Sequence, residues 1–241
     1  MEQKHHPLII LGLILGGSFI VASLVGAVTV FRLRSLSDVV SVTGSAKMPV
    51  TSDQAKWSTQ VSRTVRISNL KLGYQQIAVD LEIAKAFIKD QGILDTELTV
   101  SPVSMNEQYQ QDQSAEKIYM LSQNLEVQSS DVTKVTKASN LVSQVINKGV
   151  IFSTLSLEYF YSKLPEARIS LLSQAIADAK ARAGELAKNS GKKVGSLKSA
   201  TSGVVQVQSL NSTDVSDYGF YDTSKIEKQI MVTVKASFSL K

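Results

Sequence analysis

Few side chains of this sequence belong to the types that usually carry out catalysis. The chain has no cysteine, and its two histidines, His5 and His6, precede a long hydrophobic segment. The rest of the chain therefore lacks a histidine for a Ser-His-Asp triad, a general base or a metal ligand. A thiolate nucleophile and a disulfide are excluded as well, although the lack of cysteine fits either redox compartment.

Three carboxylates that lie close together in the sequence are the candidate cation ligands. Asp214, Asp217 and Asp222 fall in one polar segment, but their spacing does not match an EF-hand loop. The sequence has no GxGxxG or GxxxxGK[ST] phosphate loop and no GxSxG nucleophile elbow. Serine and lysine are abundant, but no motif points to a Ser–Lys dyad. The sequence thus predicts no catalytic residue, no cofactor and no metal site.

The charge balance argues against nucleic acid as a partner. The formal net charge is +5, and 43% hydrophobic with 20% charged residues is ordinary for a globular protein. Three basic residues and one acidic residue flank the hydrophobic segment, so the rest of the chain carries 23 basic and 20 acidic side chains. Nucleic-acid-binding proteins usually have a basic face or stripe. An excess of only three basic side chains does not predict such a surface.

The hydrophobic segment, Leu8 to Phe31, contains 24 residues without a charged side chain. As a helix that rises about 1.5 Å per residue, it exceeds the roughly 30 Å hydrocarbon core of a bilayer. We predict an uncleaved transmembrane anchor, marked along its length by Leu8, Ile14, Phe19, Val25 and Phe31. The alternative is a signal peptide cleaved near Val25-Gly26-Ala27, but the hydrophobic region of a signal peptide is usually about 7–15 residues long.

The charges beside this segment do not set its orientation. Lys4 and the α-amino group lie on one side, and Arg32 and Arg34 on the other, so the positive-inside comparison is nearly a tie. A short tail in front of a large domain favours a single-pass anchor in the cytoplasmic membrane, with the domain in the periplasm or outside the cell. Gly12 and Gly16 form one GxxxG spacing, which is weak evidence for a helix dimer.

Two periodicities alternate along the rest of the chain. Runs of β-forming residues, several with clear period-two alternation, predict strands near residues 39–42, 55–65, 96–103, 118–128, 150–161, 204–210 and 226–240. Apolar residues at spacings of three and four predict helices near residues 68–91, 130–149 and 164–189. Since strands come in pairs between single helices, the sequence predicts an α+β fold. We expect an antiparallel sheet that packs against about three helices. The alternative, a doubly wound parallel sheet, does not fit this pairing of strands.

The inner faces of these elements follow from the same periodicities. The strand at 55–65 should bury alternate residues, with Trp57 as a core anchor rather than a ligand platform and Arg63 as the charge on the inner row. The first strand should end at Gly44. The third helix should bury a stripe made of Ile169, Leu172, Ile176, Ala179, Ala183 and Leu186.

Two polar loops carry aromatic residues. The segment 106–114, rich in Gln and Asp, is predicted as a hairpin tip and contains Tyr109, and the segment 211–224 contains Tyr218, Phe220 and Tyr221. Exposed aromatic side chains can mark a protein–protein interface. We therefore identify these four residues as candidate contacts of a homo-oligomer. The alternative for 211–224, that its aromatic residues fold back onto their own sheet, is equally consistent with the sequence.

Several stretches occur in an order that matches a known family. They are VVSVTGSA (39–46) with SDQA (52–55), YMLSQNLEV (119–127), and AIADAKARA (175–183) continuing to ELA (185–187) and GKKVG (191–195). These stretches resemble the opening, the central strand and the signature helix of the SIMPL domain family, and the resemblance extends from about Val39 to Leu240. The chain departs at Ser52-Asp53, where the family usually has Pro-Asp, and the loop near Tyr218 has no fixed counterpart.

The resemblance implies a bacterial protein that is exported or associated with the cell envelope. Some family members build large ring- or barrel-like homo-oligomers, the family is linked to envelope stress, and it supplies no catalytic residues to carry over. We expect a short tail (1–7), an anchor (8–31), a linker (32–38) and one SIMPL-like domain outside the cytoplasm (39–241). The predicted function is that of a membrane-anchored, non-enzymatic structural protein that forms a homo-oligomer; an envelope protein partner is left unidentified.

Two other classes of function compete with this prediction. A binding module for a peptide or a lipid-like ligand would be a monomer with a deep apolar pocket. An enzyme is disfavoured because histidine is missing from the domain and cysteine from the whole chain.

Overall fold

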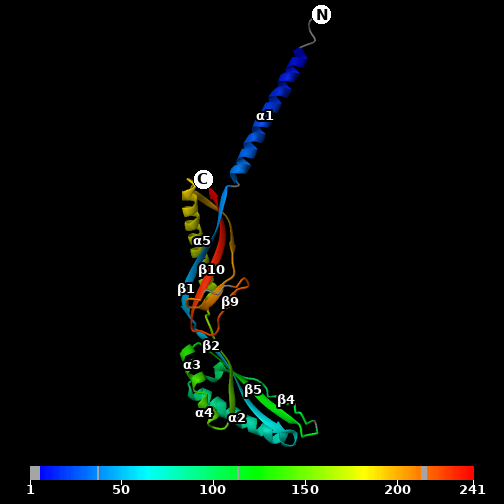
Figure 1. Ribbon diagram of the computed structural model, residues 1–241, viewed down its shortest axis with the longest axis vertical. Coiled ribbons are helices and arrows are strands. Elements are labelled where there is room, and N and C mark those ends of the chain that lie inside the picture. The colour runs from blue at the N-terminus through cyan, green and yellow to red at the C-terminus, as the bar shows by residue number, and fades with distance from the viewer. Residues whose placement is uncertain (1–5, 37, 113, 213–215) are drawn as a thin grey trace. The chain divides into compact units, whose positions relative to one another are not determined.

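The computed structural model describes residues 6–36, 38–112, 114–212 and 216–241, without the side chains of residues 6–9 and 31–36 (Figure 1). The helices are α1 (His6–Leu36), α2 (Leu70–Asp90), α3 (Val132–Asn140), α4 (Ser143–Ile146) and α5 (Leu164–Asn189), with 3-10 turns at Ile67–Asn69 and Asp95–Glu97. The strands are β1 (Val39–Thr51), β2 (Gln54–Arg66), β3 (Leu98–Val100), β4 (Ser104–Glu107), β5 (Ile118–Ser129), β6 (Ile151–Phe160), β7 (Val194–Ser202), β8 (Gln206–Ser209), β9 (Phe220–Tyr221) and β10 (Glu227–Leu240). The fold class is α+β, as predicted.

The chain forms two compact units, each with its own group of buried apolar side chains. The first unit consists of Met1–Ala46, Ile169–Val204 and Val232–Lys241, and the second of Lys47–Arg168 and Val205–Met231. The division falls within β1, α5 and β10, so each of these elements contributes residues to both units.

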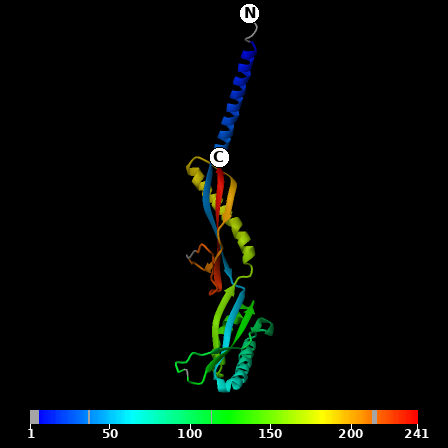
Figure 2. The same ribbon diagram turned by 90° about the vertical axis from the view of Figure 1, so that its right-hand side faces the viewer.

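The second unit is built on a sheet in the order β3-β5-β2-β6, with β4 also paired to β5. All of these pairs are antiparallel. Strands β2 and β5 pair from Ala55 opposite Ser129 to Arg66 opposite Ile118. Helices α2 and α3 pack against this sheet, as Figure 2 shows. The hairpin formed by β4 and β5 positions the loop that contains Tyr109.

The core of the second unit confirms the predicted inner row of β2. The row has no exposed surface at Ala55, Trp57, Thr59 and Val61. The Trp57 ring meets the Phe152 ring edge-on at 6.0 Å between centroids, and its Nε1 donates to Thr154 Oγ1 at 3.2 Å. Arg63 donates two hydrogen bonds to the carboxylate of Asp80 on α2, at 2.7 and 2.8 Å, and this contact raises the pKa of Arg63. The charge on the inner row is therefore paired.

Elements of the second unit also differ from the prediction. The strand expected at 96–103 is reduced to β3, because Asp95–Glu97 form a 3-10 turn, and β4 occupies residues 104–107 at the start of the expected tip. The helix expected at 130–149 divides into α3 and α4. Asp131 caps α3 by accepting a hydrogen bond from the Lys134 N–H at 2.9 Å, which lowers the pKa of Asp131.

In the first unit, α5 packs on a sheet in which β10 lies between β1 and β7 (Figure 1). Strand β1 does not end at Gly44, as predicted, but continues to Thr51. A Cβ at Gly44 would stand 2.2 Å from the carbonyl oxygen of Ala175 and 2.4 Å from the nitrogen of Ala179. The glycine is needed because the α5 backbone lies against the strand, and no turn occurs there.

The buried row of α5 differs from the predicted stripe. It consists of residues at a constant spacing of four: Ala167, Leu171, Ala175, Ala179, Ala183 and Ala187. Two members of the predicted stripe, Ile169 and Leu186, are instead 71% and 56% exposed. A row with spacing four is inclined to the helix axis, whereas the predicted stripe runs parallel to it, so the helix crosses its sheet obliquely.

Two further strands were absent from the prediction. Strand β7 pairs antiparallel with β10, from Val234 opposite Ser202 to Leu240 opposite Val194. It is mostly exposed and rich in small polar residues, so it lacks the apolar alternation that reveals a strand. In the second unit, β10 pairs with β8, and β8 pairs with β9 in parallel, which places a short strand inside the expected loop 211–224.

Candidate functional site

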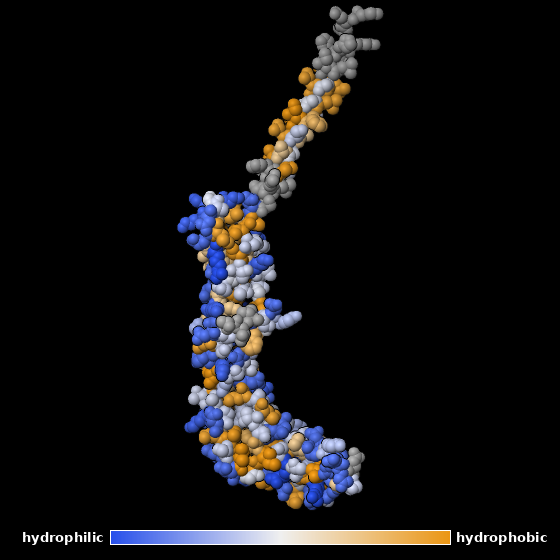
Figure 3. Space-filling model, in the orientation of Figure 1, coloured by the Kyte–Doolittle hydropathy of each residue, from blue (hydrophilic) through white to orange (hydrophobic). Residues whose placement is uncertain are grey.

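Helix α1 carries the predicted anchor residues. Ile14, Phe19 and Val25 are 63%, 77% and 60% exposed, and every side chain from Ile10 to Val30 is exposed, with apolar side chains prominent on the face in Figure 3. The side chains of Leu8 and Phe31 lie outside the described residues. Within residues 10–30 the helix is long and apolar enough to cross a membrane or to be a signal sequence.

Within residues 10–30, two hydroxyl side chains of α1 are hydrogen-bonded within the helix. The hydroxyl of Ser18 donates to the Leu15 carbonyl at 2.9 Å, and that of Thr29 donates to the Val25 carbonyl at 2.8 Å. Such internal bonding is what a lipid environment demands, because hydrocarbon offers no partner to a polar group. The segment 32–38, expected as a linker, is helical as far as Leu36, so two residues separate α1 from β1.

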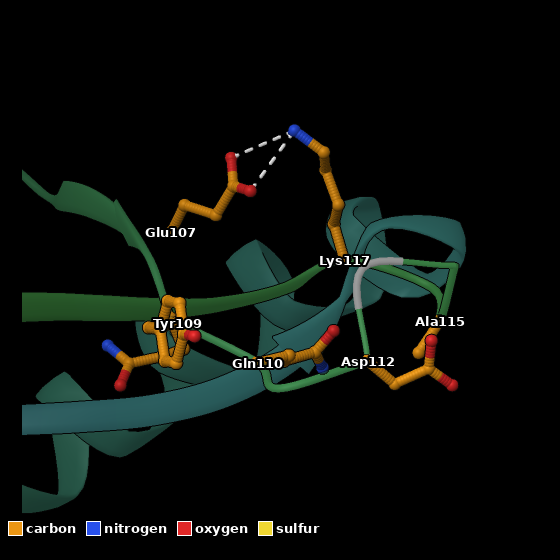
Figure 4. Close-up of a pocket in the computed structure, with 7 residues that line it drawn as sticks. Glu107, Tyr109, Gln110, Asp112, Ala115 and Lys117 are labelled. Atoms are coloured by element: carbon orange, nitrogen blue, oxygen red, sulfur yellow. Dashed lines mark hydrogen bonds and ion pairs between the residues drawn. The ribbon is translucent and has the colours of Figure 1, made fainter.

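Tyr109 projects from the hairpin that joins β4 to β5, and it is 88% exposed. Beside it lies a pocket of about 380 Å³ lined by Glu107, Gln108, Tyr109, Gln110, Asp112, Ala115 and Lys117 (Figure 4). The side chains of Glu107 and Lys117 point toward one another and form an ion pair at 3.1 Å. This lining is polar and charged, unlike the deep apolar pocket expected of a module for lipid-like ligands.

The aromatic residues of 211–224 divide between the two alternatives that the sequence left open. Tyr218 is 97% exposed and Phe220 is 49% exposed. Tyr221 instead folds back: its hydroxyl accepts a hydrogen bond from the Tyr161 N–H at 2.8 Å, and its ring lies 5.9 Å from that of Phe160. Burial raises the pKa of Tyr221. Tyr221 is therefore half-buried against the second unit, and its role as an oligomer contact stays a prediction, like that of the other three.

Strand β6 presents an exposed edge that sequence reasoning missed. The sheet order ends at β6, and Ile151 and Leu155 on this strand are 56% and 55% exposed. A register shift leaves Leu155 without a partner on β2, as in a β-bulge. Toward the other end of β6 the edge is covered, because the Tyr159 N–H donates to the Thr223 carbonyl at 2.8 Å. The residue types of 150–161 indicated a strand, but nothing in them indicated which strand ends the sheet.

A buried lysine is the chemically most unusual group of the second unit. Lys228 has no exposed surface; its Nζ donates to the carbonyl of Tyr159 and lies 4.8 Å from the centre of the Tyr221 ring. Burial lowers the pKa of Lys228 to about 8, and the negative charge of Asp222 opposes that shift only in part. The parity of the last strand could have revealed this lysine, since Lys228 lies on the inward row with Ile230 and Val232.

The environment of Lys228 favours a structural role for its amine. A lysine with a lowered pKa can attack a carbonyl substrate, but only if the substrate reaches it. Here the amine faces a main-chain carbonyl and an aromatic ring, both from its own unit, and the side chain is fully buried. The contacts join β6, β9 and β10 and so position the loop that presents Tyr218.

The carboxylates that were considered for a cation do not converge in the described residues. Asp214 lies outside them, and the oxygen Oδ1 of Asp222 accepts hydrogen bonds from the N–H and the hydroxyl of Ser224, at 2.8 and 2.7 Å. Among the residues that the structure describes, no group of three acidic or histidine side chains could hold a metal ion.

One comparison bears on the chain as a whole. The family model described as SIMPL, a protein of unknown function (DUF541), matches residues 40–238. The match covers both units and follows the helix α1. No curated protein matches the chain.

Proposed function

Because the chain belongs to the SIMPL family over residues 40–238, we propose that it is a membrane-anchored, non-enzymatic protein of the bacterial envelope that assembles into a large homo-oligomer. In this proposal α1 is an uncleaved single-pass anchor in the cytoplasmic membrane, and both units lie outside the cytoplasm. Copies associate into a ring or barrel, so that several anchors gather on one face. The observation that carries the proposal is an isolated apolar helix joined to units whose loops present aromatic side chains to solvent.

The anchor part of the proposal rests on the exposure of α1. Side chains as apolar as Ile14 and Phe19 are costly to leave in water, at roughly 25 cal/mol per Å² of apolar surface. Since no other described element covers residues 10–30, a bilayer is the environment that removes this cost. The exposed apolar surface of α1 is also what a signal peptide would have, so cleavage must be measured directly.

The assembly part rests on exposed apolar groups in the second unit. Tyr109 and Tyr218 are 88% and 97% exposed, so in a monomer their large aromatic surfaces stay in contact with water. The β6 edge adds Ile151 and Leu155 on the last strand of the described sheet, and the edge of such a sheet is a template for another strand. Symmetric association of identical chains would bury both features at once.

Mass photometry and negative-stain imaging of the full-length chain in detergent test the assembly. We expect particles whose mass is many multiples of 26.1 kDa. The double substitution Tyr109→Ser and Tyr218→Ser should reduce that mass, whereas Tyr74→Ser, which removes a 40% exposed tyrosine from α2, should leave it unchanged. Single-copy particles of the wild type would contradict self-assembly and favour the binding module.

Point substitutions test the contact role more specifically than a deletion of the whole segment 211–224 would. That segment contains Tyr221, whose hydroxyl accepts the Tyr161 N–H and whose ring contacts Lys228. Removing it would disturb the interior of the second unit and lower the mass for the wrong reason. Tyr218 can be changed alone because it is nearly fully exposed.

Membrane extraction and the mass of the mature chain test the anchor. If α1 is retained, the protein should resist extraction by alkaline carbonate and should keep the mass of the full chain. A soluble product that begins after Ala27 would show that the segment is a signal peptide.

The link to envelope stress is part of the same proposal and predicts that cells lacking the protein become more sensitive to detergent.

A further inference from the structure

One end of the first unit brings together segments that are far apart in the sequence. Lys192 Nζ contacts Asp38 Oδ2 at 2.6 Å, and the Leu240 N–H donates to the Asp38 carbonyl at 2.9 Å. Lys193 and Lys241 exchange two main-chain hydrogen bonds, both 2.8 Å long. The C-terminal end of α5, the start of β1 and the end of β10 therefore meet here, as Figures 1 and 2 both show. We call this region the basic end.

The basic end has a surplus of positive charge. Four lysines lie at it: Lys188, Lys192, Lys193 and Lys241. Asp38 is paired with Lys192, which lowers the pKa of Asp38 through a hydrogen bond and its charge, and Glu185 lies about one turn before the end of α5. Within the described residues, the other three lysines have no carboxylate in ion-pair contact. The surplus is part of a wider bias, since from Asp38 onward the first unit has eight basic and three acidic side chains.

The dipole of α5 accounts for only part of this charge. Lysines near a helix C-terminus complement the partial negative charge there, which amounts to about half an elementary charge. Lys188 and the pair Lys192 and Lys193 fit that role. Three lysines without an ion-pair partner among the described side chains exceed it several-fold, and all three are exposed to solvent.

The tether fixes where this charge must lie. Leu36, the last residue of α1, and Asp38 are two residues apart, so their Cα atoms are at most about 8 Å apart whatever the orientation of α1. From Val30 to Leu36 the helix rises about 9 Å, which is close to the depth of one headgroup layer, roughly 5–8 Å. The basic end is therefore held about a Debye length, some 8–10 Å, from the membrane surface.

On this basis, and resting on the proposed anchor, we propose that the basic end docks on the anionic phospholipid headgroups of the membrane that holds α1. Lysines near an anionic surface bind it electrostatically, and two exposed apolar side chains at this end, Val39 and Leu186, add contacts that a lipid interface provides and a free phosphate does not. Each lysine contributes about 1 kcal/mol near such a surface, so removing three should lower the ratio of docked to free states on the order of 100-fold.

The test uses the full chain in nanodiscs of phosphatidylcholine, alone or mixed with phosphatidylglycerol. Because the chain has no cysteine, a spin label on Asn189→Cys reports on the exposed last residue of α5 alone. We expect the label to be shielded from a water-soluble nickel chelate only when phosphatidylglycerol is present. High salt should remove the shielding.

Two triple variants separate the basic end from charge in general. Lys188→Gln, Lys193→Gln and Lys241→Gln should abolish the shielding, whereas Lys71→Gln, Lys137→Gln and Lys148→Gln, exposed lysines of the second unit, should retain it. Equal shielding in both lipid compositions, or an unchanged response of the first triple, would overturn the docking. Wild-type protein that fails to float with vesicles would instead overturn the anchor, so the two failures are distinguishable.

Discussion

The two units cover their sheets with side chains of opposite kinds. The second unit buries Trp57, Phe152 and many large aliphatic residues between its sheet and its helices. The first unit buries a row of alanines on α5 against β1 and β10, and at Gly44 the strand has no side chain at all. Large side chains gain more from burial, whereas small ones let two backbones approach closely. The second unit is therefore sensitive to lost volume, and the first to added volume.

The units also differ in charge and in what they expose. The first unit carries five more basic than acidic side chains from Asp38 onward, while the second has fifteen basic and seventeen acidic side chains. The second unit presents Tyr109, Tyr218 and the β6 edge. The two proposals assign membrane contact to the first unit and contact between copies to the second, and they rest on this contrast.

The largest expected effect is the removal of the Trp57 side chain. Trp57→Ala should destabilise the second unit by about 3–5 kcal/mol, because it leaves a cavity beside Phe152 and removes the partner of Thr154. Amide hydrogen exchange should accelerate in α2 and α3 and stay unchanged in residues 171–187 of α5. Equal acceleration in both regions would show that the two units unfold as one. Trp57→Phe is the matched control and should have a smaller effect.

Lys228 should make the stability of the second unit depend on pH, and the first unit has no buried lysine of this kind among its described residues. The pKa of Lys228 is about 8 in the folded chain against 10.5 for a free lysine, so between these pH values the unfolded chain holds a proton that the folded chain does not. The free energy of unfolding should therefore rise with pH across this window, by on the order of 3 kcal/mol. Lys228→Met should lose this rise, as measured by urea unfolding at pH 8 and pH 10.5. An identical rise in the variant would show that other groups cause it.

Adding a single methyl group tests the close packing of the first unit. Gly44→Ala should destabilise by about 1–3 kcal/mol, because the new Cβ meets backbone atoms of Ala175 and Ala179 that cannot move aside. Gly184→Ala, on the helix α5 that faces Gly44, is the matched control, since a Cβ there has no neighbour within 4 Å. It should stabilise by about 0.5–1 kcal/mol through helix propensity alone. Urea unfolding of both variants checks this: destabilisation by Gly44→Ala alone would show that the close approach of the backbones, and not the loss of a glycine in general, is the cause.

The buried residues of the second unit could be predicted from the sequence better than those of the first unit. In the second unit, large residues with period two predicted the inner row of β2 correctly. In the first unit, alanine is a weak signal because it is common on both faces of helices. The larger Ile169 and Leu186 therefore dominated the predicted stripe, although both are exposed. The glycine that permits close approach was taken for the end of a strand.

The candidate site was less predictable than the fold, for a physical reason. Tyr221 is half-buried in a short strand that pairs in parallel with β8, and no local periodicity encodes that pairing. The basic end is likewise assembled from Asp38, Lys192 and Lys241, whose proximity comes from strand pairing. Lys228 was not predicted to be buried, although it shares the parity of Ile230 and Val232 in the last strand.

The smallest expected effect concerns a single contact that closes α5 onto β1. Asp178 Oδ2 accepts the Ser45 N–H at 2.8 Å and Arg182 Nε at 2.8 Å, and these contacts, the first foremost, lower the pKa of Asp178. The carboxylate should stabilise the first unit above the ordinary pKa of aspartate and lose this contribution as the pH falls through its lowered value. Asp178→Ala should reduce stability less than Gly44→Ala does, and Asp178→Asn less still, because an amide oxygen can accept the same N–H. If both variants unfold at the same urea concentration as the wild type at neutral pH, the alanine row alone holds the helix in place.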